Sequence, residues 1–246
     1  MKIRTVATLL LLALPASAAV AANSFSTNGN PAAAPFGQKA LPENLVTITQ
    51  NTNTATVTTG GSVSCNGGAP SFLHTDNFYY RAFTLSDFNP PLTDLQFMVQ
   101  SVTIGVENAN DAAGAGQPIS IRIYDSSANP PLNATLGAAL STENITVSDQ
   151  ANSLLAVPLV TQPVLINAAD ILAVEVFTPS GQTAGHSFFI GSNALGQSGA
   201  SYIKAPPCGL ADIGNLAGIG FANMHIVMTV SGNNQTPVEL TTFSVD

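Results

Sequence analysis

The chain has 246 residues, with 14 acidic and six basic side chains, so its formal charge is −8. A chain this acidic, without a cluster of Lys and Arg, is a poor candidate for binding nucleic acid or an anionic membrane, because both need basic residues to displace counterions. Its hydrophobic content of 45% also argues against intrinsic disorder, which needs low hydrophobicity and high charge.

The first 22 residues have the pattern of a secretory signal peptide. Lys2 and Arg4 form a basic start, Val6–Leu14 is an apolar run, and Ala16–Ala22 is a string of small residues. The apolar run is too short to span a bilayer. We therefore expect a mature protein that is secreted or held at a cell surface, with no transmembrane segment after the signal is removed.

The remaining sequence divides into three parts. Residues 23–43 are rich in Ser, Asn, Ala and Pro and predict a flexible leader. Residues 44–232 suit one large β-sandwich domain, since such domains commonly reach this length. Residues 233–246 form a tail or an added strand.

Alternating apolar and polar residues recur through the domain and predict short strands. The predicted strands are Leu45–Thr49, Thr54–Thr58, Phe78–Leu85, Ser101–Glu107, Ile119–Ile123, Ile145–Val147, Leu172–Val176 and Ile226–Val230. Helix is expected at most as single turns in residues 109–114 or 211–218. This pattern predicts an all-β, antiparallel β-sandwich. Long connections at residues 125–142 and 191–219 favour a jelly-roll or Greek-key order.

Residues 154–176 are apolar over much of their length and invite comparison with a membrane span. Pro158, Pro163, Asn167 and Asp170 interrupt the stretch. A buried strand, a turn and a second buried strand explain it better than a helix in lipid.

Cys65 and Cys208 are the two cysteines of the chain. Export favours oxidation, so we expect them to form one disulfide that ties an early strand to a late one. The alternative is a pair of free or intermolecular thiols.

No catalytic motif stands out. The string Gly196–Ala200 fails the Gly-x-Ser-x-Gly pattern at its last residue, and none of the three histidines lies within four residues of another. Acid pairs such as Asp170 and Glu175 show no sign of facing a common cleft, as sugar hydrolysis would need. We therefore expect a protein that is not an enzyme.

Two polar clusters are candidates for metal or ligand binding. His74, Asp76 and Asn77 combine imidazole, carboxylate and amide groups, although a turn in which Asp76 or Asn77 bonds its own backbone explains them better. The calcium candidates supply four oxygen-bearing side chains in five residues, but their spacing is not that of an EF-hand. They are Glu107, Asn108, Asn110 and Asp111. Apart from this candidate calcium ion, no cofactor is expected.

Aromatic side chains are the usual platform for sugar binding, and this chain has no Trp. Tyr79 and Tyr80 are adjacent, so they point to opposite faces of a strand and at least one is expected in the core. Tyr80, Tyr124 and Tyr202 are the candidates for stacking on a sugar ring, although core packing is the commoner role of such residues.

Several strings together resemble a β-sandwich module of secreted bacterial proteins, which is appended to proteases or found in surface proteins. They are Cys65–Gly68, His74–Asn77, Tyr79–Phe83, Ile190–Asn193, Ser201–Ile203 and Cys208–Gly209. The tail at Pro237–Phe243 is similar to the opening strand of sorting or anchoring regions in exported bacterial proteins. The resemblance implies the sandwich fold and an exported location, and it carries over no catalytic residue.

These features favour a secreted, non-catalytic β-sandwich that acts through its surface in adhesion, in matrix or coat assembly, or as an accessory binding domain. The expected partner is a second copy of the chain or an extracellular polymer, either a polysaccharide or a surface protein, because a chain with so little charge leaves its edge strands poorly protected. A carbohydrate-binding module is the first alternative, and a secreted hydrolase with an unrecognised site is the second.

Overall fold

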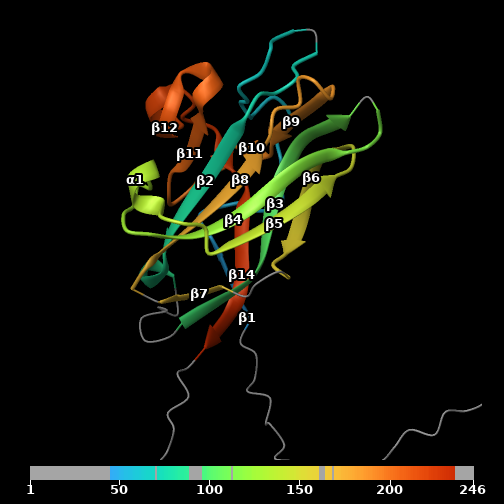
Figure 1. Cartoon of the computed structure of the whole chain (residues 1–246). Helices are drawn as coiled ribbons and strands as arrows, with labels where there is room; N and C mark the ends of the chain where they lie inside the picture. Colours follow the sequence, from blue (N-terminus) through green and yellow to red (C-terminus); the bar gives the residue numbers. More distant parts are fainter. Residues whose placement is uncertain are drawn as a thin grey trace, which may run out of the picture. The chain divides into compact units, whose positions relative to one another are not determined.

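The computed structural model describes residues 45–69, 71–88, 96–111, 113–160, 164–167 and 169–235. The expected signal peptide, the leader and the end of the tail lie outside these residues. Strands make up 55% of the described residues and helices 7%, and the strand pairs are antiparallel, which confirms the predicted all-β, sandwich-like fold (Figure 1). In the described part, no helix is long and apolar enough to cross a membrane.

The first sheet is built around its longest strand. β3 pairs with β14 and β9 along one edge and with β6 and β7 along the other, and β1 continues the sheet beyond β14. The strands are β1 (Leu45–Thr49), β3 (Gln96–Asp111), β6 (Gln150–Pro158), β7 (Val164–Asn167), β9 (His186–Ile190) and β14 (Met228–Gln235). Since β14 continues to Gln235, the domain extends three residues past the expected boundary at 232.

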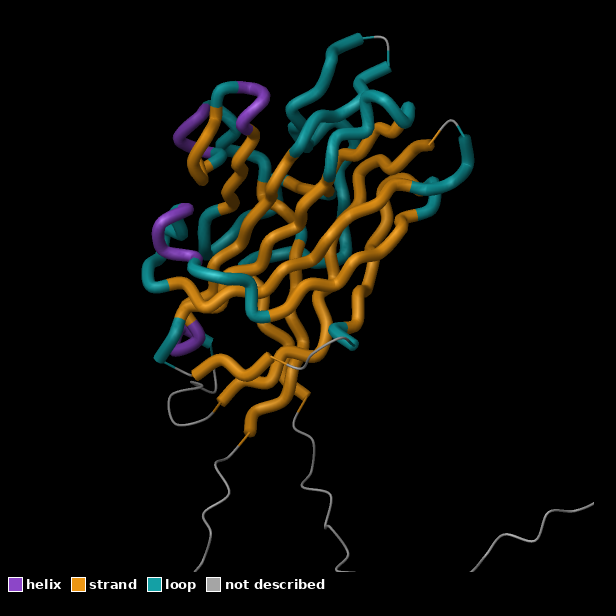
Figure 2. Tube along the Cα trace, viewed as in Figure 1, coloured by secondary structure: helices purple, strands orange, loops and turns teal. Residues whose placement is uncertain are grey.

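The second sheet has the order β12-β11-β2-β8-β4-β5, so strands far apart in the sequence are neighbours. The strands are β2 (Asn77–Thr84), β4 (Gln117–Ser126), β5 (Ser141–Val147), β8 (Ile171–Thr178), β11 (Ser201–Ala205) and β12 (Leu210–Asn215). A separate pair joins β10 (Ser192–Asn193) to β13 (His225–Ile226). Short helical segments, purple in Figure 2, lie along one side of the strands. They are η1 (Leu85–Asp87), α1 (Asn133–Leu136), η2 (Pro206–Cys208) and η3 (Ala217–Ile219).

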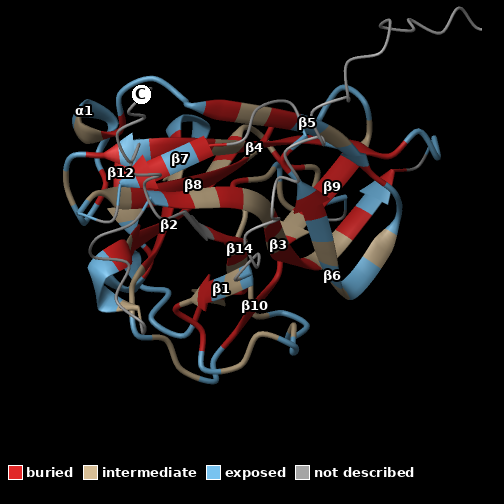
Figure 3. Cartoon of the chain, turned by 90° about the horizontal axis from the view of Figure 1, so that it is seen from below, coloured by how far each residue is buried: buried red, intermediate tan, exposed pale blue. Residues whose placement is uncertain are grey.

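The core is one cluster of buried side chains from both sheets (Figure 3). The side chains that alternation assigns to one face are buried in it. In β3, β4 and β8 these are Val102, Ile104, Val106, Ile119, Ile121, Ile123, Leu172, Val174 and Val176. Burial of each such side chain stabilises the fold by about 1.5–3 kcal/mol relative to leaving it in water.

One predicted strand is wrong. Residues 54–58 form no strand, because the side chain of Asn53 accepts hydrogen bonds from the amides of Ala55 and Thr56 and bends the chain there. The Thr58 amide then donates to the carbonyl of Ser192 rather than joining a ladder.

One expectation about the connections is confirmed in part and another is wrong. Residues 109–111 complete β3, so the first candidate region starts no helical turn, whereas the second contains the start of η3 after residues 211–215 of β12. The connection expected at residues 191–219 contains β10, β11 and β12. Of the two long connections that the sequence predicted, the one between β4 and β5 remains, and it carries α1.

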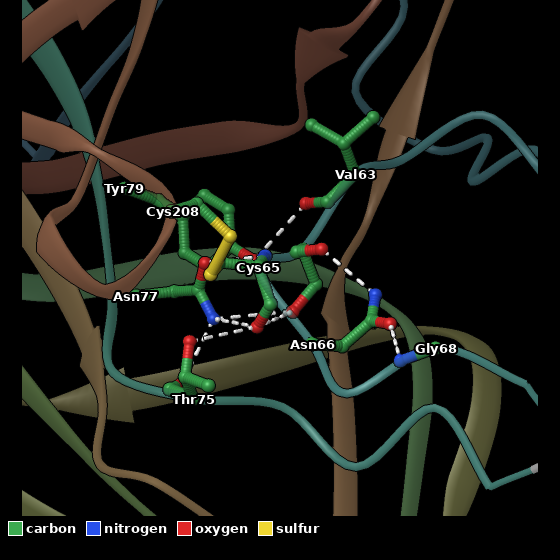
Figure 4. Close-up of a disulfide and its surroundings, with 9 residues drawn as sticks. Val63, Cys65, Asn66, Gly68, Thr75, Asn77, Tyr79 and Cys208 are labelled. Atoms are coloured by element: carbon green, nitrogen blue, oxygen red, sulfur yellow. Dashed lines mark hydrogen bonds between the residues drawn. A yellow bond between two sulfur atoms is a disulfide. The ribbon is translucent and has the colours of Figure 1, made fainter.

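The predicted disulfide between Cys65 and Cys208 is confirmed, with 5.9 Å between the two Cα atoms (Figure 4). It ties the loop before β2 to η2. The hydroxyl of Tyr79 donates to the carbonyl of Val63 on the same loop, and the Asn77 amide donates to the carbonyl of Thr75. The disulfide is therefore held against β2 by side chains of that strand.

Arg81 is fully buried between the sheets and has no carboxylate partner among the described residues. Its Nε and Nη2 donate to the carbonyl of Ile226, and its Nη1 donates to the carbonyl of Gly199 at 2.8 Å. Burial lowers the pKa of Arg81 to about 9, so the side chain stays charged at neutral pH. Its positive charge is therefore balanced by backbone carbonyls of β13 and of the loop before β11.

Candidate functional site

The outer face of the second sheet, which points away from the core cluster, carries two adjacent rows of side chains. Strand register places Tyr202, Tyr80, Glu175 and Arg122 in one row across β11, β2, β8 and β4. The next row holds Lys204, Phe78 and Phe177, followed by Ser120. These residues come from four separate parts of the chain, and only the pairing of the strands brings them together.

The first row is covered. A second apolar cluster, which we call the outer cluster, lies on this face and includes a side chain from α1 and one from β12. Its members are Tyr80, Tyr124, Leu136, Ala173, Tyr202 and Ile213. Because Tyr80 is fully buried and Tyr124 and Tyr202 are also buried, they offer no ring face to a sugar, and the prediction that they stack on a ligand is wrong.

The second row is half-exposed, and so is Arg122 at the end of the first row. Together, Lys204, Phe78 and Phe177 of the second row and Arg122 of the first form what we call the cation–aromatic array. The two rings stack with centroids 4.5 Å apart and planes 23° from parallel. The Nζ atom of Lys204 lies 4.3 Å from the Phe78 ring centroid, and the Cζ atom of Arg122 lies 4.7 Å from that of Phe177. Each ring therefore has one face against the other ring and one face against a cation.

Hydrogen bonds hold both ends of the array. The Nη1 of Arg122 donates to Glu175 at 2.6 Å, and Glu175 also accepts from the hydroxyl of Tyr124 at 3.3 Å. Burial raises the pKa of Tyr124 to about 12, and the negative charge of Glu175 is the second-largest cause of this rise. The Nζ of Lys204 donates to the side chain of Asn133 at 3.2 Å, at the start of α1. These hydrogen bonds thus hold both cations of the array in place.

The Tyr80 hydroxyl is buried in the outer cluster and has no hydrogen-bond partner in the described part of the structure. Burial, followed by the nearby charge of Glu175, raises the pKa of Tyr80, so it stays protonated. This leaves a phenol in an apolar setting beside the Glu175–Arg122 pair.

A shallow hollow of about 310 Å³ adjoins the Phe177 end of the array. Ser120, Asn144, Thr146 and Pro179 are among the residues that line it. The Ser120 hydroxyl donates to Asn144 at 2.7 Å. Neutral hydroxyl and amide groups thus border the aromatic and cationic groups.

The three-residue polar cluster does not converge on a common point. The ring nitrogens of His74 lie 3.1 Å and 2.9 Å from the carbonyl oxygens of His186 and Pro179, and burial lowers the His74 pKa. Asp76 accepts from the amide of Ser180, and Asn77 bonds to the backbone of Cys65. Each member therefore contacts protein groups of its own, and most of these lie far away in the sequence. The predicted turn is met only by the Asn77 amide, which donates to the carbonyl of Thr75.

The four calcium candidates are also spread apart. Glu107 accepts hydrogen bonds from the amides of Gly60 and Ser62, whereas Asn108 donates to Ser187. All four lie on β3, where positions 107 and 111 are about 13 Å apart.

Asp111 accepts from the amides of Ala113, Ala115 and Gly116 and lies 3.3 Å from the His186 ring. These amides, led by that of Ala113, lower its pKa. Across the described residues, no three His, Cys, Asp or Glu side chains gather as a metal site.

Two acids that the sequence did not pair lie beside one hollow. Asp125 and Asp170 line a hollow of about 290 Å³ with Ser126 and Ser127. Burial, followed by the charge of Asp170, raises the pKa of Asp125. Glu175, the acid considered with Asp170 in the sequence, instead pairs with Arg122.

Sequence reasoning missed the array because it examined tyrosines. Phe78 has the same alternation phase as Tyr80 and could have been assigned to the same face. Its contact with Phe177 could not, since those residues are about a hundred positions apart and meet only through the register of β2 with β8.

No protein-family model and no curated protein matches this chain. Among solved structures, the chain is similar to a variant of the clostridial cysteine protease Cwp84 after propeptide cleavage, with 12% sequence identity and a TM-score of 0.44. The match covers 68% of this chain and 38% of the protease.

Proposed function

We propose that this protein is an exported, non-catalytic β-sandwich that acts through its surface, in adhesion, in matrix or coat assembly, or as an accessory binding domain, and that the cation–aromatic array is its binding surface. The observation that carries the proposal is the array itself, in which two stacked rings stand between two cations on the outer face of a sheet. A rigid, half-exposed group of this kind contributes to binding without a large cost in ordering side chains.

The aromatic and cationic side chains of the array support a role in binding a partner. Aromatic and arginine side chains are enriched where proteins bind partners, and here both types sit on the central strands of a sheet. The disulfide and the expected signal peptide favour action outside the cytoplasm, where such a link persists.

The carbohydrate-binding alternative survives in a changed form. Stacking of a sugar on Tyr80, Tyr124 or Tyr202 conflicts with the burial of those rings. Recognition by charge and hydrogen bonding at the array and its neighbouring hollow does not need an open ring face.

Two measurements test the proposal. The first is location: mass spectrometry of the culture medium and of washed cells should find a chain that begins near residue 23. The second is binding: the purified protein should bind to cell envelopes or extracellular matrix from the producing organism, and Lys204→Gln should weaken that binding. Intact precursor in the cytoplasm, or binding that is the same with Lys204→Gln, would contradict the proposal.

The hydrolase alternative makes a different demand. Its best pair of acids is Asp125 and Asp170, so any turnover found in a screen of glycan and ester substrates should disappear in Asp125→Asn. Turnover that is lost in this variant would favour the enzyme over the binding module.

A further inference from the structure

We infer that the ligand of the cation–aromatic array is an acidic polysaccharide, whose carboxylates pair with Lys204 and Arg122 while its hydroxyl groups bond to neutral side chains beside them. This inference rests on the proposed function and names the chemical class of its ligand. Four observations carry it: the placement of the positive charge, the orientation of the rings, the neutral groups nearby, and the strands on which the array lies.

The array holds the positive charge of the described surface. Arg81, Arg122 and Lys204 are the Lys and Arg residues of the described part, and Arg81 is fully buried. The two that reach solvent both lie in the array, at opposite ends of one ring pair. Arg122 already pairs with Glu175, and the charge of Lys204 acts on Asp212. An anionic ligand would therefore pair with the N–H groups that these acids leave open on the two cations.

The rings add to this preference. An aromatic ring is negative on its faces and positive at its edge. The faces of Phe78 and Phe177 are taken up by each other and by the cations, so the part of each ring that a ligand can meet is its edge. Positive ring edges between two cations form a continuous surface that favours carboxylates.

Acidic residues far from the array do not repel an anionic ligand that binds there. Charges more than about 8 Å away are largely screened at physiological ionic strength. The Lys204 Nζ lies 4.3 Å from the Phe78 centroid, the two ring centroids are 4.5 Å apart, and the Arg122 Cζ lies 4.7 Å from the Phe177 centroid. The distance between the two cations therefore cannot exceed the total of these three distances. Binding therefore depends on the array, on the acids beside it such as Glu175, and on salt, more than on acids elsewhere in the molecule.

The neutral groups favour a sugar polymer. The hollow beside Phe177 presents the side chains of Ser120, Asn144 and Thr146, which can exchange hydrogen bonds with hydroxyl groups. At the other end of the array, Asn133 bonds to Lys204. Cations flanked by hydroxyl and amide groups match a chain in which carboxylates alternate with hydroxyls.

Other polyanions fit less well. Single-stranded nucleic acid binds by stacking bases on open ring faces, and here those faces are covered. An extended peptide adds to a free strand edge. The array lies on β11, β2, β8 and β4, each of which already has a neighbour on both sides.

The test measures binding of the mature protein to polygalacturonate by isothermal titration calorimetry at low and at physiological salt. The fully methyl-esterified polymer has the same backbone without the charge, and poly-L-glutamate is the peptide polyanion. Lys204→Gln should weaken binding to polygalacturonate by about fivefold, the value of one exposed ion pair. Arg122→Lys should keep most of it.

Ser86→Glu is the matched control, because it makes the same change in net charge as Lys204→Gln. Ser86 is exposed and follows the far end of β2, about 20 Å along the strand from Phe78. The Ser86→Glu variant should bind polygalacturonate as tightly as the wild type does. Thermal unfolding of each variant should match the wild type within a few degrees.

Binding to polygalacturonate that is lost with the methyl ester and weakened by Lys204→Gln but not by Ser86→Glu would support the inference. Equal binding of poly-L-glutamate would overturn the assignment to a polysaccharide. Equal loss in Lys204→Gln and Ser86→Glu would overturn the assignment to the array. If polygalacturonate does not bind but cell envelopes still bind through Lys204, the ligand class is wrong and the proposed function stands.

Discussion

The side-chain amide of Asn77 bonds to both backbone groups of Cys65. Its Oδ1 accepts from the Cys65 amide at 2.8 Å, and its Nδ2 donates to the Cys65 carbonyl at 3.0 Å. One buried side chain on β2 therefore satisfies both the amide and the carbonyl of a residue in the disulfide loop, as a neighbouring strand does in a sheet.

Asn77→Ala should destabilise the protein by about 1–3 kcal/mol, because it leaves the amide of Cys65 buried without a partner. The Cys65 carbonyl still accepts from the amide of Thr75. Urea denaturation with the disulfide intact measures this cost. Asn66→Ala, which removes hydrogen bonds from the more open part of the same loop, is the control and should cost less. Equal unfolding midpoints for Asn77→Ala and the wild type would show that the disulfide alone holds the loop.

Arg81→Met should cost about 3 kcal/mol in the free energy of unfolding, because the carbonyls of Ile226 and Gly199 lose their donors. Arg81→Lys should cost nearly as much, since an ammonium group cannot reproduce the planar fork of the guanidinium. Urea midpoints measure both. Lys204→Gln is the comparison at a half-exposed cation and should change stability by less than about 0.5 kcal/mol. A stable Arg81→Met variant would mean that the carbonyls find other donors.

Stability should fall as the pH drops below about 6.5, because burial lowers the pKa of His74 in the folded protein. Below the unfolded pKa, the unfolded chain binds a proton that the folded chain does not, so unfolding is favoured. The full contribution is present above the unfolded pKa and is lost as the pH falls toward the folded pKa. The loss should be at most about 1.4 kcal/mol per pH unit.

Urea denaturation at pH 7.5, 6.5 and 5.5 measures this dependence. His74→Gln should be less sensitive to pH than the wild type over this range. His225→Gln changes a less buried histidine and should keep the wild-type dependence. If His74→Gln and the wild type lose stability in parallel, another group is responsible.

The outer edge of β6 should allow two copies to associate. β6 contains no charged residue, its free edge is not paired in the described structure, and Leu154 is 43% exposed. Sedimentation velocity should show a larger species as the concentration rises, and Leu154→Lys should remove it. A strict monomer at high concentration would contradict self-association at this edge.

The sequence predicts structural features that depend on local alternation of apolar and polar residues or on the chemistry of single residue types. The inward faces of β3, β4 and β8 follow from apolar residues at every second position, and the disulfide follows from two cysteines in a chain that is expected to be exported. The first depends on burial of apolar side chains, which any sandwich needs, and the second on the chemistry of the two thiols.

The candidate site depended on features that alternation does not contain. Tyr80 was one candidate for an open face, with core packing as the alternative. The connection that carries α1 covers it, and nothing in a period-2 pattern signals such a cover. The stack of Phe78 on Phe177 requires the register of two distant strands. Asn53 similarly replaced a predicted strand with a side-chain hydrogen bond, a competition that strand propensity ignores.

The link between Cys65 and Cys208 spans 143 positions and encloses most of the strands. A protease that nicks any single loop between them would leave two pieces that cannot diffuse apart. Since each piece would stay at high effective concentration near the other, the sheets could re-form across the break. The molecule can thus lose the continuity of its backbone and still keep its surface.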